Sequence, residues 1–226
     1  MVNSPKITIL LLNYQRPQNL PQILRSIAAQ SLPNKVFLWN NGQAQRTAAN
    51  VTWCAESSVN VGCWGRWLAA VYADTEFICC LDDDLMFGHR DALRQVVSTL
   101  ADLEQPDVVI GLEGVVLTRG RPYYVPKRNA GFHLRSSDVP INVDIVKGRF
   151  LACRTSALST IKFAPRERED DIAICGQLAK NRPRYHLLPA GLYSSFEELP
   201  SHGCGNVKHE DHFRSREEAR RRYFIY

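Results

Sequence analysis

Apolar residues in the first half of the chain gather in short runs that alternate with amphipathic segments. Lys6–Leu12, Val36–Trp39 and Phe77–Leu81 are almost wholly apolar, which is typical of strands buried on both faces of a sheet. Between and after these runs, apolar residues three or four positions apart predict helices over Asn19–Gln30, Arg66–Ala73 and Asp91–Leu103. Val51–Cys54 is a shorter predicted strand. This alternation predicts an α/β fold with a mainly parallel central sheet and right-handed crossovers.

The second half mixes strands and helices less regularly. Its predicted strands are Val108–Leu117, Tyr123–Val125, Ile141–Lys147, Phe150–Cys153 and Tyr185–Leu188, the first two as a hairpin around Thr118–Pro122. Predicted helices are Ser156–Ile161, IAICGQLAK after the acidic residues 169–171, and the arginine-rich tail, whereas Lys127–Pro140 reads as a loop. The chain contains no internal repeat and no separating linker, so we expect one domain over residues 1–226.

Composition narrows the function classes. Of the 226 residues 45% are hydrophobic, enough for a sizeable core, yet no apolar segment approaches the roughly 18–20 residues that cross a bilayer. The net charge of +5 suits an anionic ligand, an anionic glycan or a membrane surface, and by itself is too small to indicate nucleic acid. Seven cysteines without a CxxC pair, with Cys79 and Cys80 inside an apolar run, favour buried thiols in a reducing compartment.

Asp82, Asp83 and Asp84 directly follow the apolar run Phe77–Leu81. Three adjacent carboxylates repel one another, so holding them at a cleft requires a cation or several donors. Carboxylate oxygens favour Mg²⁺ or Mn²⁺ over zinc. In an extended segment Asp82 and Asp84 would point one way and Asp83 the other. The alternative is a solvated turn that caps a following helix.

Two further polar clusters, Asn13–Arg16 and Asn40-Asn41, also follow predicted strands. The carboxyl ends of parallel strands share one sheet edge, where α/β folds bind ligands, so we expect both clusters beside Asp82–Asp84. Asparagine both donates and accepts, which suits a nucleobase edge, and Arg16 offers a forked donor to a diphosphate. Taken singly, each cluster is explained as well by a turn.

Two candidates lie later in the chain. Glu169, Asp170 and Asp171 precede a helix; capping explains one of Asp170 and Asp171, and another carboxylate could deprotonate an attacking hydroxyl. His202, Cys204, His209 and His212 fall within eleven residues. Their irregular spacing makes a zinc site one option, a single histidine completing the Asp-bound metal a second, and solvated loop histidines a third.

In their order along the chain, ITILLLNYQRP, KVFLWNNG, a loop with Asn60 and Arg66, a strand ending in DDD, and EDDIAICGQLAK resemble the exostosin-like glycosyltransferases. More broadly they resemble the GT-A superfamily, including its family 2 members. The WNNG and DDIA segments are the more specific parts, and the tail HFRSREEARRRYF is similar to the ending of that family. The resemblance implies a GT-A fold with a nucleotide-binding half at about 1–104 and an acceptor-side half at about 105–226.

The resemblance also implies roles for single residues. The donor would be a nucleotide-sugar, usually a UDP-sugar, with Mn²⁺ (or Mg²⁺) bridging its diphosphate to Asp84. The implied donor contacts are Asn13, Arg16, Asn41, Asn60, Arg66, Asp82 and Asp83, with Asn41 at the uracil. Asp170 or Asp171 would be the catalytic carboxylate at the acceptor side, and His212, less well His209, would complete the metal or phosphate site.

Departures from the pattern and competing hypotheses remain. The loop NVGCWGRW is richer in tryptophan and poorer in basic residues than exostosin-like enzymes show. The membrane anchor of the animal enzymes is missing, so we expect a cytoplasmic protein or part of a larger assembly. A nucleotidyltransferase would also hold metal at strand ends, but NYQRPQN has no glycine-rich loop. A basic module using the arginine-rich tail, which could contact a membrane, or a zinc-stabilised module are the non-catalytic alternatives. The sugar, the acceptor and the stereochemistry stay open.

Overall fold

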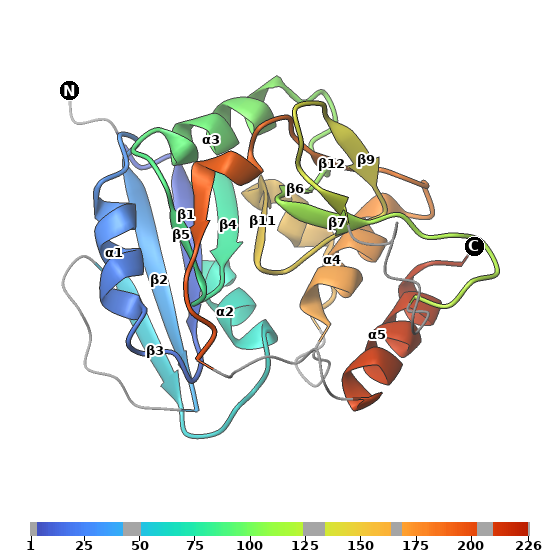
Figure 1. The fold of residues 1–226 in the computed structure, drawn as a ribbon, viewed down its shortest axis with the longest axis horizontal. Coiled ribbons are helices and arrows are strands. Elements are labelled where there is room, and N and C mark those ends of the chain that lie inside the picture. The colour runs from blue at the N-terminus through green and yellow to red at the C-terminus, as the bar shows by residue number, and fades with distance from the viewer. Residues whose placement is uncertain (1–3, 43–50, 124–133, 164–168, 203–209, 226) are drawn as a thin grey trace.

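The computed structural model describes residues 4–42, 51–123, 134–163, 169–202 and 210–225 (Figure 1). Its strands are β1 (Ile7–Asn13), β2 (Asn34–Asn41), β3 (Trp53–Ser57), β4 (Phe77–Leu81), β5 (Leu85–Phe87), β6 (Ile110–Gly111), β7 (Glu113–Val115), β8 (Leu134–Arg135), β9 (Ile141–Val143), β10 (Ile145–Val146), β11 (Phe150–Arg154), β12 (His186–Leu188) and β13 (Phe196–Glu198). Its helices are α1 (Leu20–Ala28), α2 (Trp64–Leu68), α3 (Ala92–Asp102), α4 (Asp170–Ala179) and α5 (Glu210–Tyr223), with 3₁₀ helices η1 (Ala69–Tyr72), η2 (Thr155–Thr160) and η3 (Tyr193–Ser195).

The centre of the molecule is an eight-stranded sheet with the order β3-β2-β1-β4-β11-β6-β12-β9. The first four strands in that order are parallel, whereas β11 runs antiparallel to both β4 and β6. This confirms the predicted mixed α/β fold with a mainly parallel sheet. Because β11 is reversed, the residues just before it lie at the same edge as the residues just after β1, β2 and β4.

Alternate side chains of the central strands enter two separate cores, one on each face of the sheet. Ile9 of β1 and Cys79 of β4 pack with α1 and α3 on one face. Leu10 and Cys80 pack with α2, α4 and α5 on the other face. Both cysteines are buried free thiols, as predicted. Burial on both faces explains why these strands read as unbroken apolar runs.

Helix α4 is more deeply buried than its sequence indicates. The sequence predicts a buried face of Ile172, Cys175 and Leu178 or Ala179; all four are fully buried, and Ala173 and Ile174 are fully buried as well. The tail folds into the predicted helix α5, which lies beside α4 (Figure 1). A Cβ at Gly176 would stand 2.5 Å from the Cβ of Tyr223, so only glycine permits this close approach.

One predicted element needs correction, and two strands were not predicted. Strand β7 pairs with β8 and β10, and Tyr123 is not in a strand, so the hairpin around Thr118–Pro122 is wrong. Tyr124 and Val125 lie outside the described residues. The short strands β5 and β13 pair with each other and were not predicted. Three-residue strands that pair across more than 100 positions leave no periodic signal, because each presents only one or two side chains to a face.

The Asp82–Asp84 segment is a turn between β4 and β5. The alternative interpretation predicts a turn correctly, but a strand and not a helix follows it. Glu169, not Asp170 or Asp171, holds the N-cap position of α4, and the two aspartates occupy its first turn. Asn19 holds the N-cap position of α1, but its side chain makes no capping hydrogen bond.

Among the described residues, none of the helices combines the length and the hydropathy required to pass through a lipid bilayer.

Candidate active site

Three buried asparagines lie where β1 and β2 end. The parallel register pairs Asn13 with Asn40, and the Asn13 Nδ2 donates to Asn40 Oδ1 at 2.8 Å. Asn41 holds the following loop, since its amide donates to Asn60 Oδ1 at 2.8 Å and its oxygen accepts from the Val61 N–H at 2.8 Å. The Oδ1 of Asn13 is buried and has no partner among the described residues. Asn13 and Asn40-Asn41 of the two predicted clusters therefore lie together at one edge of the sheet, and Asn60 lies beside Asn41.

The three aspartates after β4 diverge. Asp83 is buried and accepts from the Tyr14 N–H at 2.5 Å and from Arg16, which ties it to the end of β1. Asp82 and Asp84 retain 25% and 17% side-chain exposure. The former pairs with Arg66 at 2.5 Å, and the latter with Arg16 at 3.5 Å and Arg149 at 3.3 Å.

Arg66 joins the two acidic groups. This arginine of α2 is 1% exposed and reaches Asp82 with Nη1 at 2.5 Å and Asp170 with Nη2 at 3.1 Å. The indole Nε1 of Trp67 also donates to Asp170, at 2.7 Å. The tryptophan-rich segment NVGCWGRW, which differs from exostosin-like enzymes, thus supplies a hydrogen-bond donor to the acidic residues at the start of α4. Arg66 makes these ion pairs in the interior of the protein. Its contact with a nucleotide-sugar donor stays a prediction.

Asp171 is held by a second buried arginine. Arg216 of α5 contacts Asp171 with Nη2 at 2.8 Å and Nη1 at 3.2 Å, and Glu169 at 2.8 Å. It also donates to the Tyr123 hydroxyl at 2.8 Å. The arginine-rich tail is therefore only partly a basic surface: Arg216 faces inward, whereas Arg214 and Arg221 are exposed. Membrane contact through this tail stays a prediction.

The turn between β10 and β11 closes the site. The Gly148 N–H donates to Asp171 at 3.3 Å, and its carbonyl accepts from Arg66 at 3.0 Å. Arg149 follows, with its carbonyl bonded to the Asp82 N–H at 3.0 Å and its guanidinium beside Asp84. The antiparallel register of β11 against β4 brings this turn to the end of β4.

Burial and charge move the pKa values of these acids apart. Burial raises the pKa of Asp82 to about 6, although the Arg66 charge opposes the shift. Burial also raises the pKa of Asp170. Asp171 is equally buried, yet the charge and hydrogen bonds of Arg216 outweigh that burial and lower its pKa. Arg216 thus favours the ionised form of Asp171.

Carboxylates outnumber guanidinium groups in this network. Its acids are Asp82, Asp83, Asp84, Glu169, Asp170 and Asp171, and its arginines are Arg16, Arg66, Arg149 and Arg216. An excess of negative charge and hard oxygen atoms on partly exposed Asp82 and Asp84 fit a divalent cation. Such ions are commonly held by one or two carboxylates plus substrate phosphates. The donor chemistry therefore fits Mn²⁺ or Mg²⁺.

The two predicted histidines that the structure describes contact other polar side chains. His212 Nδ1 is 3.9 Å from Glu169, and His202 lies 3.2 Å from Asn19 Oδ1. Cys204 and His209 lie outside the described residues. Within the described ranges no group of three His, Cys, Asp or Glu side chains is arranged to hold a metal by itself. The assignment of His212 to a metal stays a prediction.

Several contacts of the site escaped sequence reasoning. Trp67, Gly148, Arg149 and Arg216 touch the acidic groups, but each comes from a segment read as a helix, a turn or a basic surface. Gly148-Arg149 between two apolar runs was the one signal available, because a glycine and an arginine at a strand entry mark a close approach.

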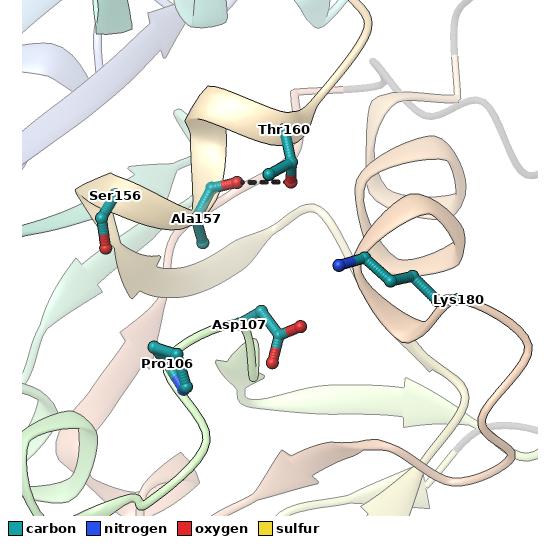
Figure 2. Close-up of a pocket in the computed structure, with 6 residues that line it drawn as sticks. All are labelled: Pro106, Asp107, Ser156, Ala157, Thr160 and Lys180. Atoms are coloured by element: carbon teal, nitrogen blue, oxygen red, sulfur yellow. Dashed lines mark hydrogen bonds between the residues drawn. The ribbon is translucent and has the colours of Figure 1, made fainter.

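Two surface cavities share no residue with this network. One of about 220 Å³ lies between η2 and the end of α4, where Lys180 extends toward it (Figure 2). A second, of about 370 Å³, is lined by Val71, Leu158, Phe163 and neighbouring residues of η1 and η2.

No known protein-family profile matches the sequence. No curated protein matches it either. Solved structures of glycosyltransferases do resemble it. The mannosyltransferase PcManGT from Pyrobaculum calidifontis, solved with GDP-Man and Mn²⁺, is 18% identical over 84% of this chain and 56% of its own, with a TM-score of 0.57.

TarS of S. aureus aligns over 87% of this chain and 37% of its own at 15% identity, with a TM-score of 0.59. TarS 1–349 with UDP-GlcNAc aligns over 82% and 56% at 14% identity, with a TM-score of 0.56. The chain thus spans 37% to 56% of the length of these proteins. At such identities the likeness shows the fold, and that fold is GT-A-like.

Proposed function

We propose that this chain is a glycosyltransferase that moves a sugar from a nucleotide-sugar donor, in first place a UDP-sugar, to a hydroxyl of a glycan or other acceptor. The observation that carries the proposal is the meeting of Asp82–Asp84 with Asp170-Asp171 through one buried arginine, Arg66, at the ends of parallel strands. The exostosin-like and family 2 glycosyltransferases remain the families proposed from sequence. GDP-Man and UDP-GlcNAc in two structural neighbours support a donor of this class.

In this proposal the donor lies along the strand ends. Asn13, Asn41 and Asn60 face the base, and Arg16 faces the diphosphate. A divalent ion held by Asp84, with Asp82 and Asp83 beside it, would supply positive charge that neutralises the leaving diphosphate. Arg16 adds its own charge to that end, since the bond between the anomeric carbon and phosphate oxygen leaves its electrons on the diphosphate.

The acceptor reacts at the acidic end of α4. Its hydroxyl oxygen bonds to the anomeric carbon while its proton passes to a carboxylate, for which Asp171 is the first candidate because Arg216 favours its ionised form, the form that can accept a proton. Asp170 stabilises positive character on the sugar ring. Attack opposite the leaving group inverts the anomeric centre, and attack from the same side retains it, so product NMR assigns the stereochemistry.

The test is hydrolysis or transfer with a panel of UDP-GlcNAc, UDP-glucose and GDP-mannose, with and without Mn²⁺. Asp84→Ala should cut the Mn²⁺-dependent rate by about a hundredfold or more, since it removes the carboxylate at the diphosphate. Asp91→Ala is the control, because Asp91 is 55% exposed at the start of α3. Unchanged turnover in Asp84→Ala would defeat the proposal.

A further inference from the structure

Arg149 contacts three carboxylates at once. Its Nε lies 3.3 Å from Asp84 Oδ1, and its Nη1 lies 3.4 Å from Glu198 and 3.8 Å from Glu113. The side chain is 26% exposed, so it has room to shift between them. Glu198 and Glu113 belong to β13 and β7 and also contact Arg135, which lies over the Tyr193 ring.

Arg16 also contacts Asp84, but it is fixed by other bonds. It pairs with buried Asp83, and its Nε donates to the Ser201 carbonyl at 3.1 Å, while its contact with Asp84 is longer, at 3.5 Å. Leaving Asp83 would strand a buried carboxylate, which is costly. Arg149 can leave Asp84 without such a loss, because Glu198 and Glu113 already flank it.

Arg149 faces Oδ1 of Asp84 and Arg16 faces Oδ2, so a divalent ion bound at Oδ1 would lie against the Arg149 guanidinium. Two cations cannot share that oxygen at contact distance without strong repulsion. We propose that Arg149 occupies the cation's place beside Asp84 in the metal-free protein, and that metal binding moves it away from Asp84 toward Glu198 and Glu113, which it already contacts. This inference rests on the proposed function, which places the metal at Asp84. Arg149 is then a positioning residue, whose contacts with Glu113 of β7 and Glu198 of β13 change when the metal binds.

The test measures Mn²⁺ affinity without turnover, by electron paramagnetic resonance of free Mn²⁺ in the presence of UDP. Arg149→Gln should lower the Kd for Mn²⁺ by about three- to tenfold, the range expected for removing one partly exposed charge pair. Arg149→Lys keeps the competing charge and should stay near the wild-type value.

Arg154→Gln is the matched control. Arg154 lies at the opposite end of β11, is 23% exposed, and pairs with Glu76 at 3.1 Å. It removes the same charge from the same strand, so its Kd for Mn²⁺ should equal that of the wild type. Thermal melts of each variant check that the fold is kept.

A double-mutant cycle tests the movement of Arg149 itself. Glu198→Gln removes the receiving carboxylate, so it should weaken Mn²⁺ binding in the wild type and have no effect in Arg149→Gln. Equal Kd values for wild type and Arg149→Gln overturn this inference alone. An equal effect of Glu198→Gln in both backgrounds also overturns it. A wild-type protein that binds no Mn²⁺ with UDP overturns both this inference and the proposed metal site.

Discussion

The two acidic groups of the site have nearly the same composition and opposite construction. Asp84, in the turn after β4, meets its arginines at 3.3 and 3.5 Å and keeps 17% exposure. Asp171, in the first turn of α4, is 4% exposed and is held at 2.8 Å by Arg216. The first group can exchange its cationic partners, whereas the second is fixed in place. In the proposed function, this difference separates the carboxylate assigned to the metal from the one assigned to proton transfer.

The largest expected effect is at the fixed group. Arg216→Ala leaves Glu169 and Asp171 buried without their counter-charge, which should cost about 3–5 kcal/mol of unfolding free energy. Urea denaturation followed by circular dichroism measures the loss. Arg214→Ala, on the same helix and 71% exposed, should change stability by less than about 0.5 kcal/mol. Equal free energies of unfolding for the two variants would show that the buried ion pairs of Arg216 do not stabilise the fold.

The next effect separates chemistry from binding. Asp171→Asn should cut sugar transfer by about 10²–10⁴-fold, the usual contribution of a general base, and change the Kd for UDP by less than about twofold. Stopped assays of transfer and calorimetry with UDP measure the two quantities. Asp170→Asn is the companion variant, since Asp170 has a raised pKa and contacts Arg66. Loss of UDP binding in Asp171→Asn would instead make this residue structural.

The smallest effect is a difference in pH dependence between the two groups. Burial raises the folded-state pKa of Asp82 from its ordinary value of 3.8 to about 6. The stability that Asp82 contributes is therefore present below pH 3.8 and is lost as the pH rises through about 6. Asp171 has a lowered pKa, so its contribution is present at higher pH and lost as the pH falls. Asp82→Asn should therefore gain about 1–2 kcal/mol relative to wild type between pH 4 and pH 7. Thermal melts across that range test this, and parallel profiles would contradict it.

The fold was predictable where local pattern and burial agree. The β1 and β4 segments are apolar throughout because both faces of the sheet are covered, and α1 and α3 have one apolar face because they cover it. The pairing of β7 with β8 and of β5 with β13 was not predictable, since two- and three-residue strands are fixed by distant partners and not by their own pattern.

The residues of the candidate site at strand ends were predictable from the sequence, whereas the residues that hold the acidic side chains in place were not. Asn13, Asn41 and Asp82 follow strands, and parallel topology alone brings them to one edge. Arg216 reads as one of five arginines on a polar tail, and only the packing of α5 against α4 shows that it is buried. Charge composition cannot separate an inward arginine from an outward one.

Because β11 is reversed, two kinds of loop meet at the edge of the sheet where the candidate site lies. Strand exits deliver the asparagines and aspartates, and a strand entry delivers Lys147, Gly148 and Arg149. These two kinds of loop are joined, because the Arg149 carbonyl accepts from the Asp82 N–H and the Arg149 guanidinium pairs with Asp84. In the proposed function, a change at the β10–β11 turn would therefore act on the metal-binding carboxylate through Arg149, while the strands that carry Asn13 and Asn41 are left unaltered.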